Sequence, residues 1–134
     1  MELIIGGAYQ GKLTHAVSQH SLERDEMLDL AEITGKTDFS INLSKIRCVY
    51  HLESLTYHAV KSGSCQTAFY FIDNLIKSSP KVIIISREVG SGIVPMGKDE
   101  RLFREFHGEI LSKIAARADR VMRVFCGICT CIKG

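Results

Sequence analysis

The stretch that decides the fold is residues 2–16, which read ELIIGGAYQGKLTHA. An apolar run, Leu3 to Ile5, leads into a glycine-bearing loop, and a predicted helix starts at Lys12. Gly6, four further residues, Gly11 and Lys12 have the spacing G-x-x-x-x-G-K. Between a strand and a helix, this spacing predicts a loop whose backbone N–H groups cradle phosphate, with the lysine adding a positive charge.

The position after the lysine is unusual for such a loop. A serine or threonine there normally ligates the magnesium of the bound nucleotide, but this chain has Leu13. Thr14 follows one residue late, roughly 100° further round a helix. Lys12 alone would also fit a solvated lysine at a helix start, but the glycines favour the phosphate role. The predicted nucleotide-binding residues are Gly6, Gly7, Ala8, Tyr9, Gln10, Gly11, Lys12, Leu13 and Thr14.

Length and composition restrict the class of protein. The chain has 134 residues, of which 46% are hydrophobic and 24% charged, with a net charge of +2. This fits one domain over residues 1–134. Basic residues are interspersed with acidic ones, which argues against nucleic-acid binding. No run has the features of a signal peptide or the length of a membrane span, so we expect a soluble, cytoplasmic protein.

Five cysteines are present, three of them clustered as Cys126, Cys129 and Cys131. An odd number argues against a secreted disulfide framework. In a strand, Cys129 and Cys131 would share one face as small hydrophobes. Metal or redox chemistry is the alternative, but it needs a further ligand or partner.

Hydrophobic spacing outlines the other elements, most clearly after residue 64. Residues 82–85 form a continuous β-branched run, typical of a strand buried on both faces of a parallel sheet. Asp99 is expected to cap the following helix, and His15 and His107 to lie at the surface. The pattern predicts helices over 12–19, 65–76 and 99–118, and strands over 3–5, 39–43, 49–52, 82–85, 121–125 and 129–132, with a turn at Gly127.

Strands that alternate with helices predict an α/β fold with a mostly parallel sheet and an antiparallel C-terminal hairpin. Ligands of such sheets bind at the carboxyl ends of the strands. Three segments are expected to meet there: residues 6–12, the residues around Glu53, and residues 87–95. Their convergence predicts a nucleotide site. Glu53 and Glu88 are its candidate acidic members, although either would also fit an ordinary ion pair, and His51 and His58 flank Glu53.

One loop points to a particular family. Residues 87–95 read REVGSGIVP and resemble the E-V-G-x-G-I-V-P loop of the adenosylcobinamide kinase/adenosylcobinamide-phosphate guanylyltransferase family of cobalamin biosynthesis. The likeness extends through Arg101 to Glu105 and Ala118 to Val121, and residues 6–16 are similar to that family's G-G-A-R-S-G-K-S-x-x-A start.

The resemblance implies a three-layer α/β/α fold of the phosphate-binding-loop class and two activities. The family phosphorylates the aminopropanol hydroxyl of adenosylcobinamide, then transfers GMP from GTP onto that phosphate through a guanylylated histidine. GTP or ATP with Mg²⁺, adenosylcobinamide and a homotrimer are thereby implied. Lys12, Glu53 and Glu88 would be the catalytic residues and Glu53 a metal ligand. Arg87, Val89, Gly90, Gly92 and Pro95 would form the substrate loop.

Two departures from the family pattern limit the expected activity. Leu13 removes a magnesium-ligating hydroxyl, and no histidine occurs between His20 and His51, where the family has its acceptor. We therefore expect guanylyl transfer to be reduced or lost. Kinase-type phosphoryl transfer stays open beside the alternative of a nucleotide-binding or regulatory subunit without catalysis.

Overall fold

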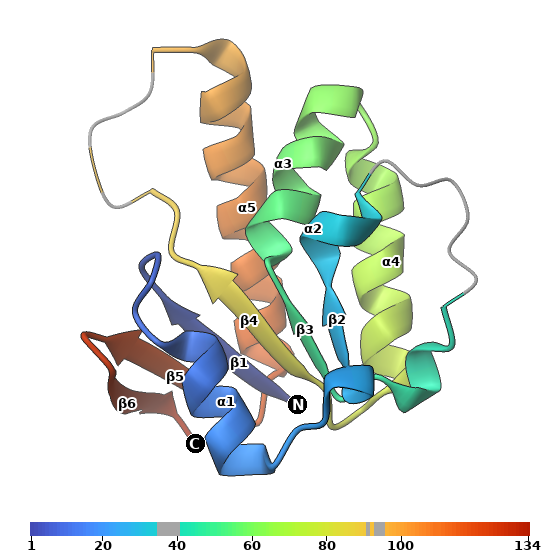
Figure 1. The fold of residues 1–134 in the computed structure, drawn as a ribbon. Helices are drawn as coiled ribbons and strands as arrows, with labels where there is room; N and C mark the ends of the chain where they lie inside the picture. Colours follow the sequence, from blue (N-terminus) through green and yellow to red (C-terminus); the bar gives the residue numbers. More distant parts are fainter. Residues whose placement is uncertain (35–40, 91, 93–95) are drawn as a thin grey trace.

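A computed structural model describes residues 1–34, 41–90, 92 and 96–134. Its centre is a six-stranded sheet in the order β2-β3-β4-β1-β5-β6, in which β6 alone runs antiparallel to its neighbour (Figure 1). The strands are β1 (Glu2–Gly6), β2 (Met27–Asp29), β3 (Cys48–Tyr50), β4 (Ile83–Arg87), β5 (Arg120–Phe125) and β6 (Ile128–Lys133). The helices are α1 (Lys12–His20), α2 (Leu30–Ile33), α3 (Leu52–Ser62), α4 (Cys65–Ser78) and α5 (Lys98–Arg117), with 3-10 turns at Arg24–Glu26 and Leu43–Lys45.

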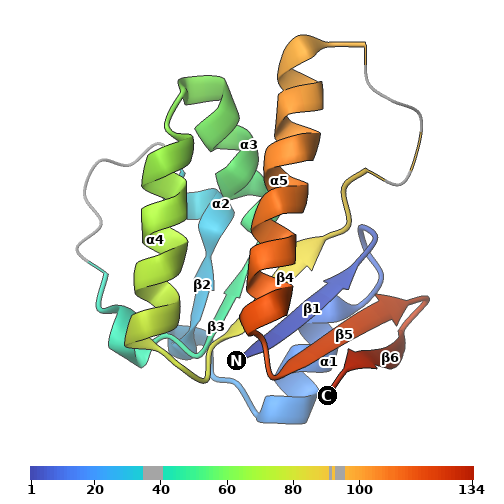
Figure 2. The same cartoon turned by 180° about the vertical axis from the view of Figure 1, so that it is seen from behind.

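The sheet is covered on both faces, which confirms the predicted α/β fold. In β4, Ile84 packs with the cluster that includes α3, α4 and α5, whereas Ile83 and Ile85 pack with the cluster that includes α1. These three isoleucines are at most 4% exposed, as the continuous β-branched run predicted. Figure 1 shows α1 in front of the sheet, and Figure 2 shows α4 and α5 on the opposite face.

A tight hairpin joins β5 to β6. Phe125 pairs with Ile128, so the loop contains two residues, Cys126 and Gly127, with φ of 50° and 76°. Positive φ at both positions is the type I′ geometry, whose twist suits a two-residue hairpin. The predicted antiparallel return strand is therefore confirmed.

The sequence missed strand β2 and helices α2 and α3, and it misplaced a strand end. The strand predicted over 49–52 ends at Tyr50, and α3 begins at Leu52. Leu52, Leu55 and Ala59 are buried at helical spacing, and Gly63 ends the helix in the left-handed region at φ 68°. Glu53 therefore stands in the first turn of a helix rather than in a loop.

Three further predictions were wrong. Of the strand predicted over 39–43, the described residues 41–43 form no strand, because Leu43 begins a 3-10 turn; residues 35–40 lie outside the described ranges. Asp99 does not cap α5, whose N-cap is Gly97; it lies in the first turn and pairs with Lys61 at 3.2 Å. His107 is fully buried rather than at the surface. None of the described helices is long and apolar enough to cross a membrane.

Candidate functional site

A cleft of about 450 Å³ opens at the carboxyl edge of the parallel strands. The loop between β1 and α1 forms one wall, and the ends of β3 and β4 with the start of α3 form the other. Of the three segments expected to meet here, residues 8–12, Glu53 with its neighbours, and Arg87 line this cleft, whereas Gly6 and Gly7 do not. The lining residues are Ala8, Tyr9, Gln10, Gly11, Lys12, Leu13, Thr14, Ala31, Tyr50, His51, Glu53, Ser54, Ile85, Ser86 and Arg87.

Two glycines give the loop its shape. A Cβ on Gly6 would lie 2.3 Å from the carbonyl oxygen of Val124, so the chain can leave β1 beside β5 only without a side chain. Gly11 has φ 88° and is the N-cap of α1, with no side-chain hydrogen bond on the first turn. The first N–H groups of a helix have no partner within the helix. This helix start is therefore suited to accept an anion.

Lys12 bends back across the loop. Its Nζ donates to the Gly7 carbonyl at 2.6 Å. Partial burial is the main cause that lowers the Lys12 pKa, and the positive charge of Arg87 acts in the same direction, while Glu53 and Glu88 oppose it. The ammonium group therefore lies among the three charged residues that the sequence placed in the site.

Leu13 and Thr14 differ in their surroundings. Both line the cleft, but Leu13 also packs against the core cluster under α1, whereas Thr14 is exposed. Leu13 offers no oxygen to a metal ion. Among the described residues, no three His, Cys, Asp or Glu side chains gather closely enough to hold one. This donor set does not form a protein cage for Mg²⁺, which in nucleotide sites also takes phosphate and water oxygens.

Glu53 is an acidic group held in place at the cleft. It is 8% exposed, and its Oε2 accepts the backbone N–H of Arg87 at 3.0 Å. Its place in the first turn of α3 suits a negative charge, because the helix dipole is positive there. The carboxylate therefore joins α3 to the end of β4.

Glu88 has a different environment. Arg123 of β5 binds it in a bidentate manner, with Nε 2.7 Å from Oε1 and Nη2 3.0 Å from Oε2. This pair matches the ordinary ion-pair alternative that the sequence left open for Glu88. Arg123 was not singled out from the sequence, since an arginine on an exposed strand position gives no signal of its partner.

A second cleft, of about 390 Å³, adjoins the first. Glu53 and Arg87 line both clefts. Of the predicted substrate loop, Arg87, Val89, Gly90 and Gly92 line the second cleft, and Pro95 lies outside the described residues. Its other lining residues are Tyr57, Glu88, Glu100, Phe103 and Arg104.

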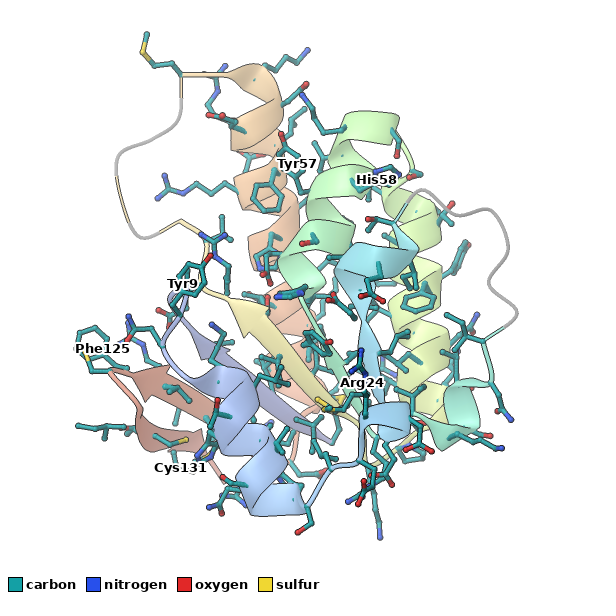
Figure 3. The ribbon with its side chains drawn as sticks, viewed as in Figure 1. Tyr9, Arg24, Tyr57, His58, Phe125 and Cys131 are labelled. Atoms are coloured by element: carbon teal, nitrogen blue, oxygen red, sulfur yellow. The ribbon has the colours of Figure 1, made fainter. Side chains whose placement is uncertain are left out.

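The aromatic wall of the second cleft was missed by sequence reasoning. The Tyr57 and Phe103 rings meet edge to face with centroids 5.2 Å apart. Figure 3 shows Tyr57 reaching from α3 toward α5, whereas His58 projects elsewhere and lines neither cleft. Recognising this pair would have required α3 to be predicted first.

His51 does line the first cleft. Its Nδ1 lies 2.7 Å from Oδ1 of Asp29, the residue that also caps α2 through the Ala31 N–H. Of the clustered cysteines, Cys129 is half-buried and packs against the core below α1, while Cys126 and Cys131 are exposed. The small-hydrophobe interpretation therefore fits Cys129 but not Cys131.

The turn of the β5–β6 hairpin donates two hydrogen bonds to Gln10 of the phosphate loop. The Gly127 N–H donates to the Gln10 carbonyl at 3.1 Å, and the Cys126 N–H donates to the Gln10 side-chain oxygen. Tyr9 and Phe125 lie at this same end of the molecule in Figure 3, exposed by 105% and 65%. Sequence alone did not indicate this contact between residues more than a hundred positions apart.

A mostly parallel α/β sheet with a glycine loop between its first strand and first helix defines a phosphate-binding-loop class of fold. A family model described as cobinamide kinase / cobinamide phosphate guanyltransferase matches residues 12–132. The chain belongs to this family.

Two curated relatives carry the name bifunctional adenosylcobalamin biosynthesis protein CobU. The protein from Salmonella typhimurium is 43% identical over 53 residues, and the one from Escherichia coli is 42% identical over 53 residues. Each match covers 40% of this chain and 29% of the relative. The resemblance predicted from residues 87–95 and their flanks is confirmed at the level of the family.

Proposed function

We propose that the chain binds GTP or ATP in the first cleft and transfers the γ-phosphoryl group to an alcohol of the adenosylcobinamide class in the second. The observation that carries this proposal is that Glu53 and Arg87 line both clefts. A phosphoryl group transfers in line between two oxygens held close together. Two adjoining clefts with shared charged residues suit a donor and an acceptor.

The roles of the residues follow from their positions. The loop N–H groups, the start of α1 and Lys12 would bind the triphosphate, and Arg87 would contact the transferred group. The acceptor oxygen forms a bond to the γ-phosphorus as the bond to the bridging oxygen breaks, and the nucleoside diphosphate leaves. Glu53 or Glu88 would orient the acceptor hydroxyl and take its proton. Mg²⁺, when bound with the nucleotide, supplies charge neutralisation, and Glu53 is its candidate protein ligand.

The second candidate function is a nucleotide-binding or regulatory subunit without turnover. It is favoured by Leu13, whose side chain packs against the core cluster under α1 and offers no hydroxyl to a metal ion. Guanylyl transfer is the activity we expect to be reduced or lost, because residues 21–50 contain no histidine.

We also propose that the chain forms a homo-oligomer. The resemblance implies three copies, and sedimentation of the purified chain would test this number.

Titration with fluorescent GTP and ATP analogues, with and without Mg²⁺, tests the proposal. Lys12→Ala is expected to weaken binding by about 10-fold or more, since it removes the phosphate-facing charge. Lys81→Ala is the matched control: it removes the same charge at the opposite edge of the sheet, before β4, and should change binding less than 2-fold.

The outcomes separate the candidates. Absent binding, or equal binding by Lys12→Ala and wild type, contradicts the phosphate site. Tight binding that is indifferent to Mg²⁺, without transfer to an adenosylcobinamide-like alcohol, favours the regulatory subunit over the kinase. Acid-labile label left on the protein by labelled GTP would overturn the expected loss of guanylyl transfer.

A further inference from the structure

His107 is a buried polar residue with no role in the scheme above. It lies on α5, is 0% exposed, and its ring tilts against Phe103 of the second cleft with centroids 5.6 Å apart. Both ring nitrogens have partners: Nδ1 is 2.7 Å from Thr56 Oγ1, and Nε2 is 3.1 Å from Ser86 Oγ and 3.2 Å from the Arg87 carbonyl oxygen. The imidazole thus connects α5 with α3 and with the end of β4.

The backbone of Arg87 is held by two side chains of this region. Its N–H is bound by the Glu53 carboxylate at 3.0 Å, and its carbonyl oxygen lies 3.2 Å from His107 Nε2. Side chains from two different helices therefore hold the two polar groups of this one backbone unit. Arg87 is also the last residue of β4, where the chain leaves the sheet between the two clefts.

The contact with the Arg87 carbonyl indicates which nitrogen carries the proton. A carbonyl oxygen only accepts, so the contact with Arg87 requires a proton on Nε2. Nδ1 then accepts from the Thr56 hydroxyl, for which it is a closer partner than the Leu52 and Glu53 carbonyls at 3.2 and 3.1 Å. With its proton on Nε2, a neutral imidazole donates toward Arg87 and accepts from Thr56. The Ser86 hydroxyl then has the Arg87 carbonyl oxygen at 3.3 Å and Glu53 Oε2 at 3.5 Å as its acceptors.

We propose that His107 is a positioning residue that, together with Glu53, fixes the Arg87 backbone and so aligns the guanidinium that both clefts share. The functional part of this inference rests on the proposed nucleotide site. The structural part does not, because hydrogen exchange of the Arg87 amide can be measured without any ligand. His107 touches neither cleft directly and acts through Arg87.

Amide hydrogen exchange of the full chain tests the structural part. His107→Leu should raise the exchange rate of the Arg87 amide at least 10-fold relative to that of Ile84 in the middle of β4, and His107→Gln, which keeps a donor, should restore most of the protection. Ile114→Ala is the control, since it opens the same buried face of α5 without a polar change and should not single out Arg87.

Nitrogen-15 NMR of the imidazole in the wild-type chain provides a second readout. A neutral ring with its proton on Nε2 is expected at pH 7. A proton on Nδ1, or an Arg87 amide whose exchange in His107→Leu rises only as much as that of Ile84, overturns the inference. These readouts hold even if the chain binds no nucleotide, so failure of the site and failure of the inference are distinguishable.

The functional part has its own measurement. In a wild-type chain that binds the fluorescent nucleotide, His107→Leu should weaken binding about 5- to 10-fold, while Ile114→Ala should change it less than 2-fold. Recovery in His107→Gln would support a positioning role. Unchanged binding in His107→Leu would show that alignment of Arg87 does not serve the site.

Discussion

At the scale of single residues, Gly6 has the strictest steric requirement in the phosphate loop. We expect Gly6→Ala to lower the free energy of unfolding by about 1–3 kcal/mol, because the new Cβ would lie 2.3 Å from the Val124 carbonyl oxygen and force β1 and β5 apart. Urea denaturation followed by circular dichroism measures the change.

Gly108→Ala is the control for this substitution. Gly108 lies inside α5, and a Cβ there meets nothing within 4 Å. Because alanine is the better helix former, this variant should be stabilised by up to about 1 kcal/mol. A Gly6→Ala chain as stable as wild type would show that β1 and β5 tolerate the displacement.

The polar residues in the site and next to it differ in how readily a sequence reveals them. Lys12 and Glu53 stand beside recognisable features, a glycine loop and the end of a strand. His107 and Arg123 do not, because their roles depend on partners distant in the chain: Thr56 and Arg87 for one, Glu88 for the other. A polar residue on an amphipathic helix was assigned to the surface, and only the packing of α3 against α5 reverses that assignment.

At the scale of elements, long and strongly patterned segments were predicted well. The β4 run, α4 and the final hairpin match their predictions, since each has several apolar residues in a pattern typical of its element. Strand β2 has only three residues, too few to show a period. Helix α3 starts two residues after β3 ends, so its first residue was assigned to the strand. The strand order could not be predicted from the sequence, because it depends on pairing between distant segments.

The β5–β6 hairpin leads to a prediction about the phosphate loop. We expect Gln10→Ala to weaken nucleotide binding about 3- to 10-fold, because the Cys126 N–H would lose its acceptor and one of the two hydrogen bonds described between hairpin and loop would be lost. Titration with the fluorescent nucleotide measures the loss. Gln66→Ala, on the exposed surface of α4, is the control. Equal affinities for the two variants would mean that the hairpin does not support the loop.

At the scale of the whole molecule, we propose that residues 1–134 fold as one domain. The two hydrophobic clusters lie on opposite faces of the same sheet, and β1, β4 and β5 contribute side chains to both. Unfolding of one face would therefore expose strands that the other face needs. A perturbation at one buried residue should accordingly appear in the stability of the entire chain.

The pH dependence of stability tests whether a change at one buried residue, His107, affects the stability of the entire chain. Burial lowers the His107 pKa from its usual value of 6.5, while the Arg87 carbonyl and the charge of Glu53 raise it and the charge of Arg87 lowers it. The unfolded chain then binds more protons than the folded one below about pH 6.5. This contribution to stability is complete above that pH and is lost as the pH falls through the lowered value.

We therefore expect the free energy of unfolding to decrease between pH 7 and pH 5, by about 1.4 kcal/mol for each unit by which the pKa is lowered. His107→Gln, which cannot titrate, should be less stable at pH 7 but should lose less stability over this range. The paired carboxylates Asp73 and Glu26 have pKa values below their usual 3.8 and 4.5, so they act mainly at lower pH. Urea denaturation at both pH values gives the comparison. Parallel losses in the two chains would mean that His107 does not remain neutral in the folded state.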